Sequence, residues 1–269
     1  MIVFPNAKIN LGLNIIRKNV NGYHDLETIF YPLMKVKDAL EIVPSKNGAV
    51  NFHLSGINIE GNPTENLCLK AYQLLKTDFP DIPPVDIFLH KNIPTGAGLG
   101  GGSADGSFTL RILNKLFLNL PAENLEKYAL QLGSDCPFFI NNTPVFAQGR
   151  GEKFKKIELD LSAYSILLVN PGLHISTKEA FSSITPKQPT YSLKEIVTKP
   201  IEQWRDLMMN DFEKSVFQIH PVLANIKSEL YKTGALYASL TGTGSTVYGI
   251  FPNKTNYPDF PPDWRLLWN

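Results

Sequence analysis

The stretch Pro94-Thr-Gly-Ala-Gly-Leu-Gly-Gly-Gly-Ser-Ala-Asp-Gly-Ser107 stands out in this chain, because five of its first nine residues are glycine. An apolar run over residues 85–89 precedes it, and a helix-like run over residues 108–117 follows it. Glycine lets bare backbone N–H groups close around phosphate oxygens, and the N-terminus of a helix adds partial positive charge. The order of these segments therefore predicts a strand, a phosphate-binding loop and a helix, and it disfavours a flexible linker.

Two common classes of phosphate-binding loop do not fit this stretch. A Walker A loop ends in Gly-Lys-Ser/Thr, but no lysine lies between Thr95 and Thr109. Residues 96–101 do match Gly-x-Gly-x-x-Gly, which alone is a weak signal. A dinucleotide-binding fold also needs a βαβ unit with an acidic residue about 20 residues further on, whereas residues 119–125 open another helix. The sequence thus predicts a glycine-rich loop of another class.

The composition is that of an ordinary globular protein. The chain has 269 residues, of which 43% are hydrophobic and 19% are charged, and its formal net charge is +1. A net charge near zero gives no general attraction to nucleic acid or to an anionic membrane, so neither is expected as a partner. Cys68 and Cys136 are too far apart for a Cys-x-x-Cys site, and the sequence has neither a signal-peptide pattern nor a long apolar run. We therefore expect a cytoplasmic protein with reduced thiols.

Residues 7–15 alternate between apolar and polar side chains, which predicts a half-buried strand. Lys8 and Asn10 are two residues apart on the polar face, so they project side by side. They form either a plain solvent face or part of a site, and the pattern leaves both interpretations open. Gly12 on the same face leaves room for a close neighbour.

Tyr23 and His24 follow a turn signal at Asn21-Gly22 and precede a second alternating run over residues 26–31. An aromatic residue and a histidine at the tip of a hairpin have two interpretations. They are either incidental, or they stack on a flat ring and hydrogen-bond its edge.

Asp135 lies in the otherwise apolar segment 134–140, shortly after a predicted helix that Pro121 opens. Its carboxylate is either an N-cap ahead of Pro137 or a base held in apolar surroundings. The spacing does not decide between these two roles.

A second glycine turn, residues 241–245, joins predicted strands at residues 236–240 and 246–251. It is either a simple hairpin turn or a loop that approaches the first glycine stretch or the substrate. Two amphipathic helices are predicted before it, at residues 204–217 and 221–231.

Another helix is predicted to begin near residue 62. Asn62 would be its N-cap, Pro63 its first residue and Glu65 its third. Asn66, in the first turn of this helix, would then help to cap it.

Together these stretches resemble the GHMP kinases, a family that includes galactokinase, homoserine kinase and mevalonate kinase. The resemblance rests on residues 7–13, Gly22-Tyr-His24, the glycine loop, residues 133–138 and residues 240–245, which occur in the expected order. It is closer to the branch that acts on 4-diphosphocytidyl-2-C-methyl-D-erythritol, in the non-mevalonate route to isoprenoids. Together the segments span most of the chain, and they form a specific signal.

The resemblance implies an α+β fold of two domains. A domain of the ribosomal protein S5 domain 2 type would form the N-terminal part, residues 1–150. A ferredoxin-like domain would form the C-terminal part, residues 151–269, and the active site would lie between the two.

The resemblance also implies a reaction, which is phosphorylation of the 2-hydroxyl of the methylerythritol unit by ATP. Asp135 matches the catalytic base of the family, and Lys8 matches its partner lysine. Tyr23 and Phe181 match the aromatic residues that sandwich the cytosine, with His24 on the edge of the base. Mg²⁺ would bridge the β- and γ-phosphates, and the sequence identifies no protein ligand for it.

The remaining site residues carried over from the family are of two kinds. The nucleotide would be bound by Asn66, Pro94, Thr95, Gly96, Ala97, Gly98, Leu99, Gly100, Gly101, Gly102, Ser103 and Ala104. The cytidyl substrate would be bound by Asn10, Tyr23, His24, Thr177, Phe181, Gly242, Thr243 and Gly244.

Two alternative functions are a GHMP kinase for a small alcohol, such as homoserine or mevalonate, and a non-catalytic nucleotide-binding protein. Gly22-Tyr-His24 with Phe181 argues against the first, because a small alcohol needs no aromatic clamp. Lys8 and Asp135 argue against the second, because they supply the chemistry.

Overall fold

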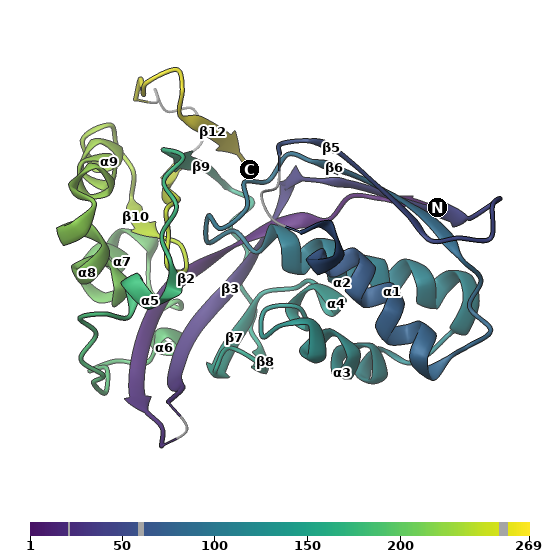
Figure 1. The fold of residues 1–269 in the computed structure, drawn as a ribbon. Coiled ribbons are helices and arrows are strands. Elements are labelled where there is room, and N and C mark those ends of the chain that lie inside the picture. Colours follow the sequence, from purple (N-terminus) through teal and green to yellow (C-terminus); the bar gives the residue numbers. More distant parts are fainter. Residues whose placement is uncertain (21, 59–61, 253–257) are drawn as a thin grey trace. The chain divides into compact units, whose positions relative to one another are not determined.

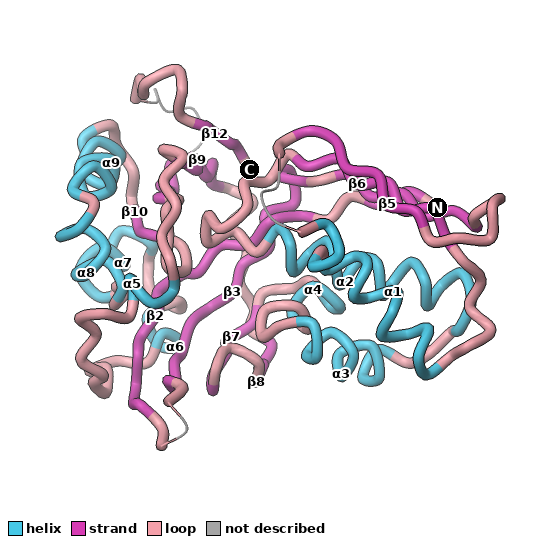
Figure 2. The backbone as a smooth tube through the Cα atoms, in the orientation of Figure 1, coloured by secondary structure: helices cyan, strands magenta, loops and turns pink. Residues whose placement is uncertain are grey.

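The computed structural model describes residues 1–20, 22–58, 62–252 and 258–269. The chain forms two compact units, of which unit 1 contains residues 1–7, 32–95 and 100–143. Unit 2 contains residues 8–31, 96–99 and 144–269. Figure 2 shows helices and strands in both, in agreement with the expected α+β class. The domain boundary near residue 150 stays a prediction, and Asn21 of the predicted turn lies outside the described residues.

Unit 1 is built on a sheet with the strand order β1-β4-β6-β5. Its strands are β1 (Ile2–Val3), β4 (Ala39–Pro44), β5 (Asn51–Gly56) and β6 (Val85–Lys91). β6 pairs antiparallel with β4 and parallel with β5. A parallel pair needs a crossover, and the segment with α1 (Leu67–Asp78) supplies it. The predicted strand at residues 85–89 is therefore confirmed, and it has a paired neighbour on each side.

Four α-helices accompany this sheet in unit 1 (Figure 1). α2 (Gly101–Leu113) contacts α1, α3 (Ala122–Leu132), α4 (Phe138–Asn141) and β4. It continues into a π-helical turn, η2 (Asn114–Leu118). Ten of the thirteen residues of α2 are buried, because other helices and the sheet surround it.

The helix expected near residue 62 begins later than predicted. Asn62 caps only a short 3₁₀ turn, η1 (Pro63–Glu65), by accepting a hydrogen bond from the Thr64 N–H. α1 begins at Leu67, and Asn66 is its N-cap. Asn62 caps η1 and Asn66 caps α1, whereas the sequence pattern predicted a single helix that contains both segments.

Unit 2 contains an antiparallel sheet with the strand order β10-β11-β9-β12. Its strands are β9 (Tyr164–Asn170), β10 (Tyr237–Leu240), β11 (Val247–Pro252) and β12 (Arg265–Trp268). α9 (Pro221–Lys232) packs on β10 and β11, and α8 (Phe212–Ile219) packs beside α9 (Figure 1). The two predicted strands that flank the second glycine turn are thus confirmed as a hairpin.

A third sheet has the order β2-β3-β7-β8. Its strands are β2 (Asn6–Lys18), β3 (His24–Lys37), β7 (Val145–Gly149) and β8 (Lys153–Lys156). Gly12 on β2 has a positive φ of 66°, and a Cβ at this position would lie 2.5 Å from Leu193 Cδ2. The expected room for a close neighbour at Gly12 is therefore confirmed, and Leu193 of α6 (Leu193–Ile196) fills it.

The single helix predicted over residues 204–217 is wrong. The chain forms η3 (Ile201–Gln203) and α7 (Trp204–Leu207), then leaves the helix and re-enters it at α8. Between them, Asn210 bridges to Leu13 of β2, and its side chain donates to the carbonyls of Leu240 and Gly242. These tertiary hydrogen bonds outweigh the helical preference of the segment. No helix among the described residues is long and apolar enough to cross a membrane.

Candidate functional site

The glycine stretch forms the predicted strand, loop and helix, but the helix begins inside the loop. α2 starts at Gly101 after an N-cap, Gly100, with a φ of 71°. No side chain caps this end of α2, Gly102 is exposed, and a Cβ on Gly102 would meet no atom within 4 Å. The first N–H groups of a helix lack partners within the helix. In unit 1 they are therefore accessible to an anion such as a phosphate.

The middle of the same stretch, residues 96–99, belongs to unit 2 and contacts the second glycine turn. Thr241 Oγ1 donates to the Gly98 carbonyl at 2.9 Å, and the Thr246 N–H donates to the Ala97 carbonyl at 3.3 Å. A Cβ on Gly98 would lie 2.0 Å from the Thr241 carbonyl oxygen. The prediction that the second turn approaches the first glycine stretch is confirmed, and glycine is required at residue 98 for this approach.

Lys8 and Asn10 are buried in unit 2, so the interpretation of a plain solvent face is wrong. Each side chain has only 3% exposure. Lys8 Nζ donates to Asn10 Oδ1 at 2.6 Å and to the Gly98 carbonyl at 3.1 Å, and it lies 5.0 Å from the centre of the Phe30 ring. Asn10 Nδ2 donates in turn to Thr28 Oγ1. These contacts hold a buried ammonium directly beside the glycine stretch.

The predicted aromatic residues gather in unit 2 around a ring stack. The His24 imidazole stacks on Phe181, with 4.7 Å between the ring centres. Burial, together with the charge of Lys18, lowers the pKa of His24, which favours its neutral form. Phe181 also packs edge-on against Phe212. The structure thus brings two of the three predicted cytosine-contacting residues together.

Tyr23 remains 55% exposed, and the sequence did not identify its neighbour. The Arg150 guanidinium lies 4.9 Å from the centre of the Tyr23 ring, as a cation–π contact. Arg150 sits in the turn between β7 and β8, and β7 pairs with β3 next to Tyr23. The Gln148-Gly-Arg-Gly-Glu152 pattern indicated this turn, but only strand pairing could place the arginine.

Asp135 lies in a half-buried turn of unit 1 between α3 and α4. The N-cap of α4 is Pro137, and no side chain caps this helix. The capping role considered for Asp135 is therefore wrong. Its neighbours Cys136 and Phe138 are buried, and burial raises the pKa of the Cys136 thiol to about 11. Asp135 is thus followed by buried, uncharged residues, and its role as a base stays a prediction.

Two further predicted residues lie at helix starts. Asn66 Oδ1 accepts a hydrogen bond from the Cys68 N–H at 2.9 Å, which confirms that Asn66 caps α1. Thr177 is the first residue of α5 (Thr177–Ala180), and its side chain lies outside the described part of the structure.

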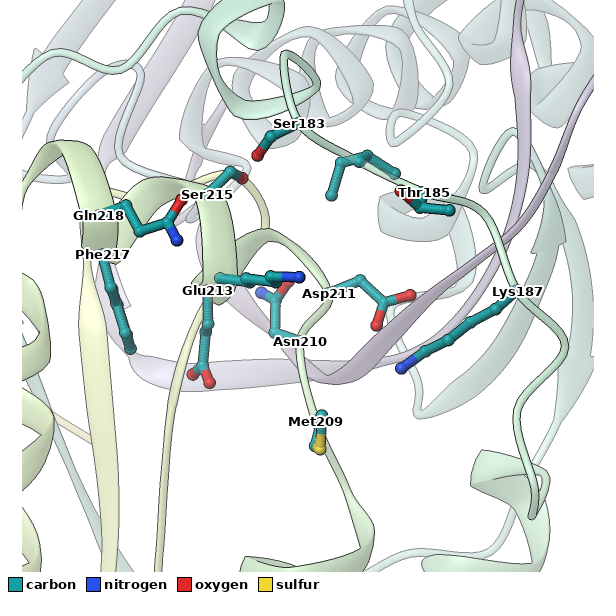
Figure 3. Close-up of a pocket in the computed structure, with 12 residues that line it drawn as sticks. Ser183, Thr185, Lys187, Met209, Asn210, Asp211, Glu213, Ser215, Phe217 and Gln218 are labelled. Carbon is teal, nitrogen blue, oxygen red and sulfur yellow. The ribbon is translucent and has the colours of Figure 1, made fainter.

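A pocket of about 560 Å³ in unit 2 contains none of the predicted residues. Figure 3 shows residues 183–187 on one side of it, and α8 with the segment before it on the other. Two polar side chains that line it, those of Glu213 and Ser215, already have structural partners. Glu213 accepts from Lys227 and from the Leu240 N–H, and Ser215 donates to the Ala180 carbonyl. These groups stabilise the packing of unit 2.

No metal-binding cluster is present in the part of the chain that the structure describes. Specifically, these residues contain no group of three or more His, Cys, Asp or Glu side chains that could hold an ion.

Comparison with protein families gives matches in both halves of the chain. Residues 66–143 match the model of the GHMP kinases N-terminal domain. Residues 192–256 match the model of the GHMP kinases C-terminal domain.

The chain is also similar to proteins over nearly its whole length. A protein of Bacteroides fragilis is 54% identical over 93% of this chain and 92% of its own length. A protein of Bacteroides thetaiotaomicron is 51% identical over 98% and 96%, respectively. Both are named 4-diphosphocytidyl-2-C-methyl-D-erythritol kinase.

Solved structures show a similar arrangement. A crystal structure of 4-(cytidine 5'-diphospho)-2C-methyl-D-erythritol kinase superposes with a TM-score of 0.80, at 28% identity, over 93% of this chain and 90% of that one. A crystal structure of mevalonate kinase superposes with a TM-score of 0.69 at 16% identity, over 100% and 98% of the two chains. The second likeness concerns the fold alone.

Proposed function

The chain belongs to the GHMP kinase family. We propose that it phosphorylates the 2-hydroxyl of 4-diphosphocytidyl-2-C-methyl-D-erythritol. Its fold is that of the family, with a ribosomal protein S5 domain 2-like N-terminal domain and a ferredoxin-like C-terminal domain. It is a phosphotransferase with an alcohol group as acceptor, and ATP is its co-substrate.

One observation carries the choice of acceptor. The Bacteroides fragilis relative named for this substrate is 54% identical, and the matched region covers more than nine-tenths of both chains. The residues that resembled a cytosine clamp, Tyr23, His24 and Phe181, support the same acceptor. In unit 2, His24 and Phe181 stack on each other, so aromatic surface is assembled there.

The nucleotide is proposed to bind at the glycine loop. The uncapped N-terminus of α2 offers backbone N–H groups around Gly101 and Gly102 to the triphosphate. Asn66 is proposed to contact the adenosine while it caps α1. Mg²⁺ is expected to be held mainly by phosphate oxygens, which suits a chain whose described residues lack an acidic metal cluster. When bound, the ion neutralises phosphate charge.

Asp135 is proposed as the catalytic base. Phosphoryl transfer requires little covalent participation by the protein, but it requires a group that accepts the proton of the attacking hydroxyl. The Asp135 carboxylate would take that proton as the 2-oxygen bonds to the γ-phosphorus and ADP leaves. Lys8 is proposed to stabilise the negative charge that develops on the oxygen. Its ammonium is held by Asn10 and Gly98 and is shielded from water, where a fixed charge acts strongly.

The acceptor can be tested with purified full-length protein and ATP. Release of ADP is measured with 4-diphosphocytidyl-2-C-methyl-D-erythritol, mevalonate and homoserine as separate acceptors. We expect turnover only with the cytidyl compound. Equal or faster turnover with mevalonate or homoserine would reject the proposed acceptor, and no turnover with any of them would reject the kinase assignment.

Tyr23→Ala is expected to raise the KM for the cytidyl substrate with a small effect on kcat. The reason is that one stacked base contributes about 1–3 kcal/mol, or roughly fivefold to 150-fold in affinity. The KM for ATP should not change, because Tyr23 lies on no element of the glycine loop. Tyr191→Ala, which removes another exposed tyrosine of unit 2, is the matched control. An unchanged KM for the cytidyl substrate in Tyr23→Ala would remove Tyr23 from the clamp.

A further inference from the structure

Unit 1 contains three buried charged side chains that the proposed reaction does not use. Lys91 is 2% exposed, Asp38 1% and Asp105 2%. Lys91 Nζ donates to Asp38 Oδ2, and it donates to Asp105 Oδ2 at 2.7 Å. Placing two carboxylates and one ammonium in a protein interior is costly, so such a network commonly fixes a particular geometry.

The network is attached to the chain on both sides of the glycine loop. Asp38 Oδ1 accepts the backbone N–H groups of Asn92 at 2.6 Å and of Ile93 at 2.8 Å, immediately before Pro94. Asp105 lies one helical turn into α2, after the loop. Lys91 therefore connects the residues that enter the loop to the helix that leaves it.

Lys91 also lies directly against the first residue of α2. A Cβ on Gly101 would lie 3.3 Å from Lys91 Nζ and 2.8 Å from Ile93 Cγ2. The lysine ammonium therefore lies close to the backbone at the start of α2, where N–H groups are open to an anion. A Walker A loop presents its lysine from the loop itself, whereas this stretch has none between Thr95 and Thr109.

We propose that Asp38, Lys91 and Asp105 form a positioning network for the glycine loop, and that nucleotide affinity depends on Lys91. This inference rests on the proposed function, because it takes the loop to be the site of the triphosphate. Through its hydrogen bonds to Asp38 and Asp105, Lys91 holds the residues before Pro94 and the start of α2 at a fixed spacing. It also offsets part of the negative charge of the two carboxylates, which would otherwise oppose a phosphate bound nearby.

The two carboxylates of the network have different tasks. Both oxygens of Asp38 have hydrogen-bond partners, whereas Asp105 Oδ1 is buried without one. Burial raises the pKa of Asp105 to about 7, against the opposing effect of Lys91. Asp38 therefore anchors the backbone, and Asp105 serves through its one oxygen that accepts from Lys91. An asparagine at residue 105 can keep that acceptor, and an alanine cannot.

The test measures binding of a non-hydrolysable ATP analogue with Mg²⁺ to full-length protein by calorimetry, alongside thermal unfolding. Lys91→Met should weaken binding by about tenfold or more, since the charged hydrogen bonds to Asp38 and Asp105 are lost and the negative charge of these carboxylates is no longer offset. Asp105→Asn should bind more tightly than Asp105→Ala. The KM for the acceptor should change much less than the KM for ATP.

Two further variants separate positioning from general stability. Lys76→Met removes another lysine of unit 1, whose Nζ holds the carbonyls of Pro80 and Ile82 at 2.5 and 2.6 Å. It should lower the unfolding temperature and leave nucleotide affinity unchanged. If Lys91→Met does not fold, the double variant Lys91→Met/Asp105→Asn removes the ammonium and one carboxylate together, and it should fold and bind the analogue weakly.

The outcomes distinguish the two proposals. If the wild-type protein does not bind the analogue, both the proposed function and this inference are rejected. If the wild type binds and Lys91→Met or the double variant binds equally well, only the positioning network is rejected. The network is also rejected if Lys76→Met weakens binding as much as Lys91→Met, or if Asp105→Ala binds as tightly as Asp105→Asn.

Discussion

Asp135→Asn should lower kcat by about 10²- to 10⁴-fold, the range that a positioned general base contributes. The amide has nearly the shape of the carboxylate but cannot take up the proton of the 2-hydroxyl. Nucleotide affinity should persist, because the open N–H groups of α2 do not involve Asp135. Single-turnover kinetics with saturating ATP and cytidyl substrate would isolate the chemical step.

Asp86→Asn is the matched control for this experiment. Asp86 is likewise a half-buried aspartate of unit 1, and it accepts a hydrogen bond from Asn51 on the neighbouring strand β5. Its substitution should leave kcat unchanged. Nearly wild-type turnover in Asp135→Asn would show that Asp135 is structural and that another group takes the proton.

Lys8→Met should lower kcat by about 10²- to 10³-fold, which is typical for removal of one preorganised charge-stabilising group. The methionine keeps most of the apolar stem but loses the ammonium. Asn10 Oδ1 and the Gly98 carbonyl would then each lose a donor in a buried region. We therefore also expect a lower unfolding temperature, and the measurement pairs steady-state kinetics with thermal unfolding.

Lys37→Met controls for the general loss of a lysine near an aromatic ring. Lys37 Nζ lies 5.8 Å from the centre of the Phe4 ring, much as Lys8 lies over Phe30, but Lys37 is exposed. The control should keep both kcat and stability. If Lys8→Met is destabilised yet keeps its kcat, Lys8 has a structural role only.

The strand, loop and helix around the glycine stretch were predictable because their signals are local. An apolar run indicates β6, glycines indicate the loop, and a helix-like run over residues 108–117 indicates α2. The start of α2 at Gly101 was not predictable, since glycine has a low helix propensity. Packing compensates for this in α2: a Cβ on Gly106 would lie 2.9 Å from Leu67 Cβ, so glycine permits close contact with α1.

The buried state of Lys8 and Asn10 could not be predicted from alternation alone. The pattern of β2 indicates one apolar and one polar face, and a polar face usually meets solvent. In the structure, groups from distant segments contact the side chains on that face. Lys8 Nζ donates to the Gly98 carbonyl, and Thr241 Oγ1 donates to Asn10 Oδ1 across a separation of 231 residues.

Short sequence motifs indicated the family, the α+β class, the loop proposed to bind phosphate and the residues proposed for catalysis. Each of these motifs consists of residues close together in the sequence, so it can be recognised without knowledge of the fold. The burial of Lys8, the contact of Thr241 with Gly98 and the position of Lys91 beside Gly101 became evident only in the folded chain. Each of these contacts joins segments that only folding brings together. Their partners must satisfy buried charges and hydrogen bonds in three dimensions, which no local pattern specifies.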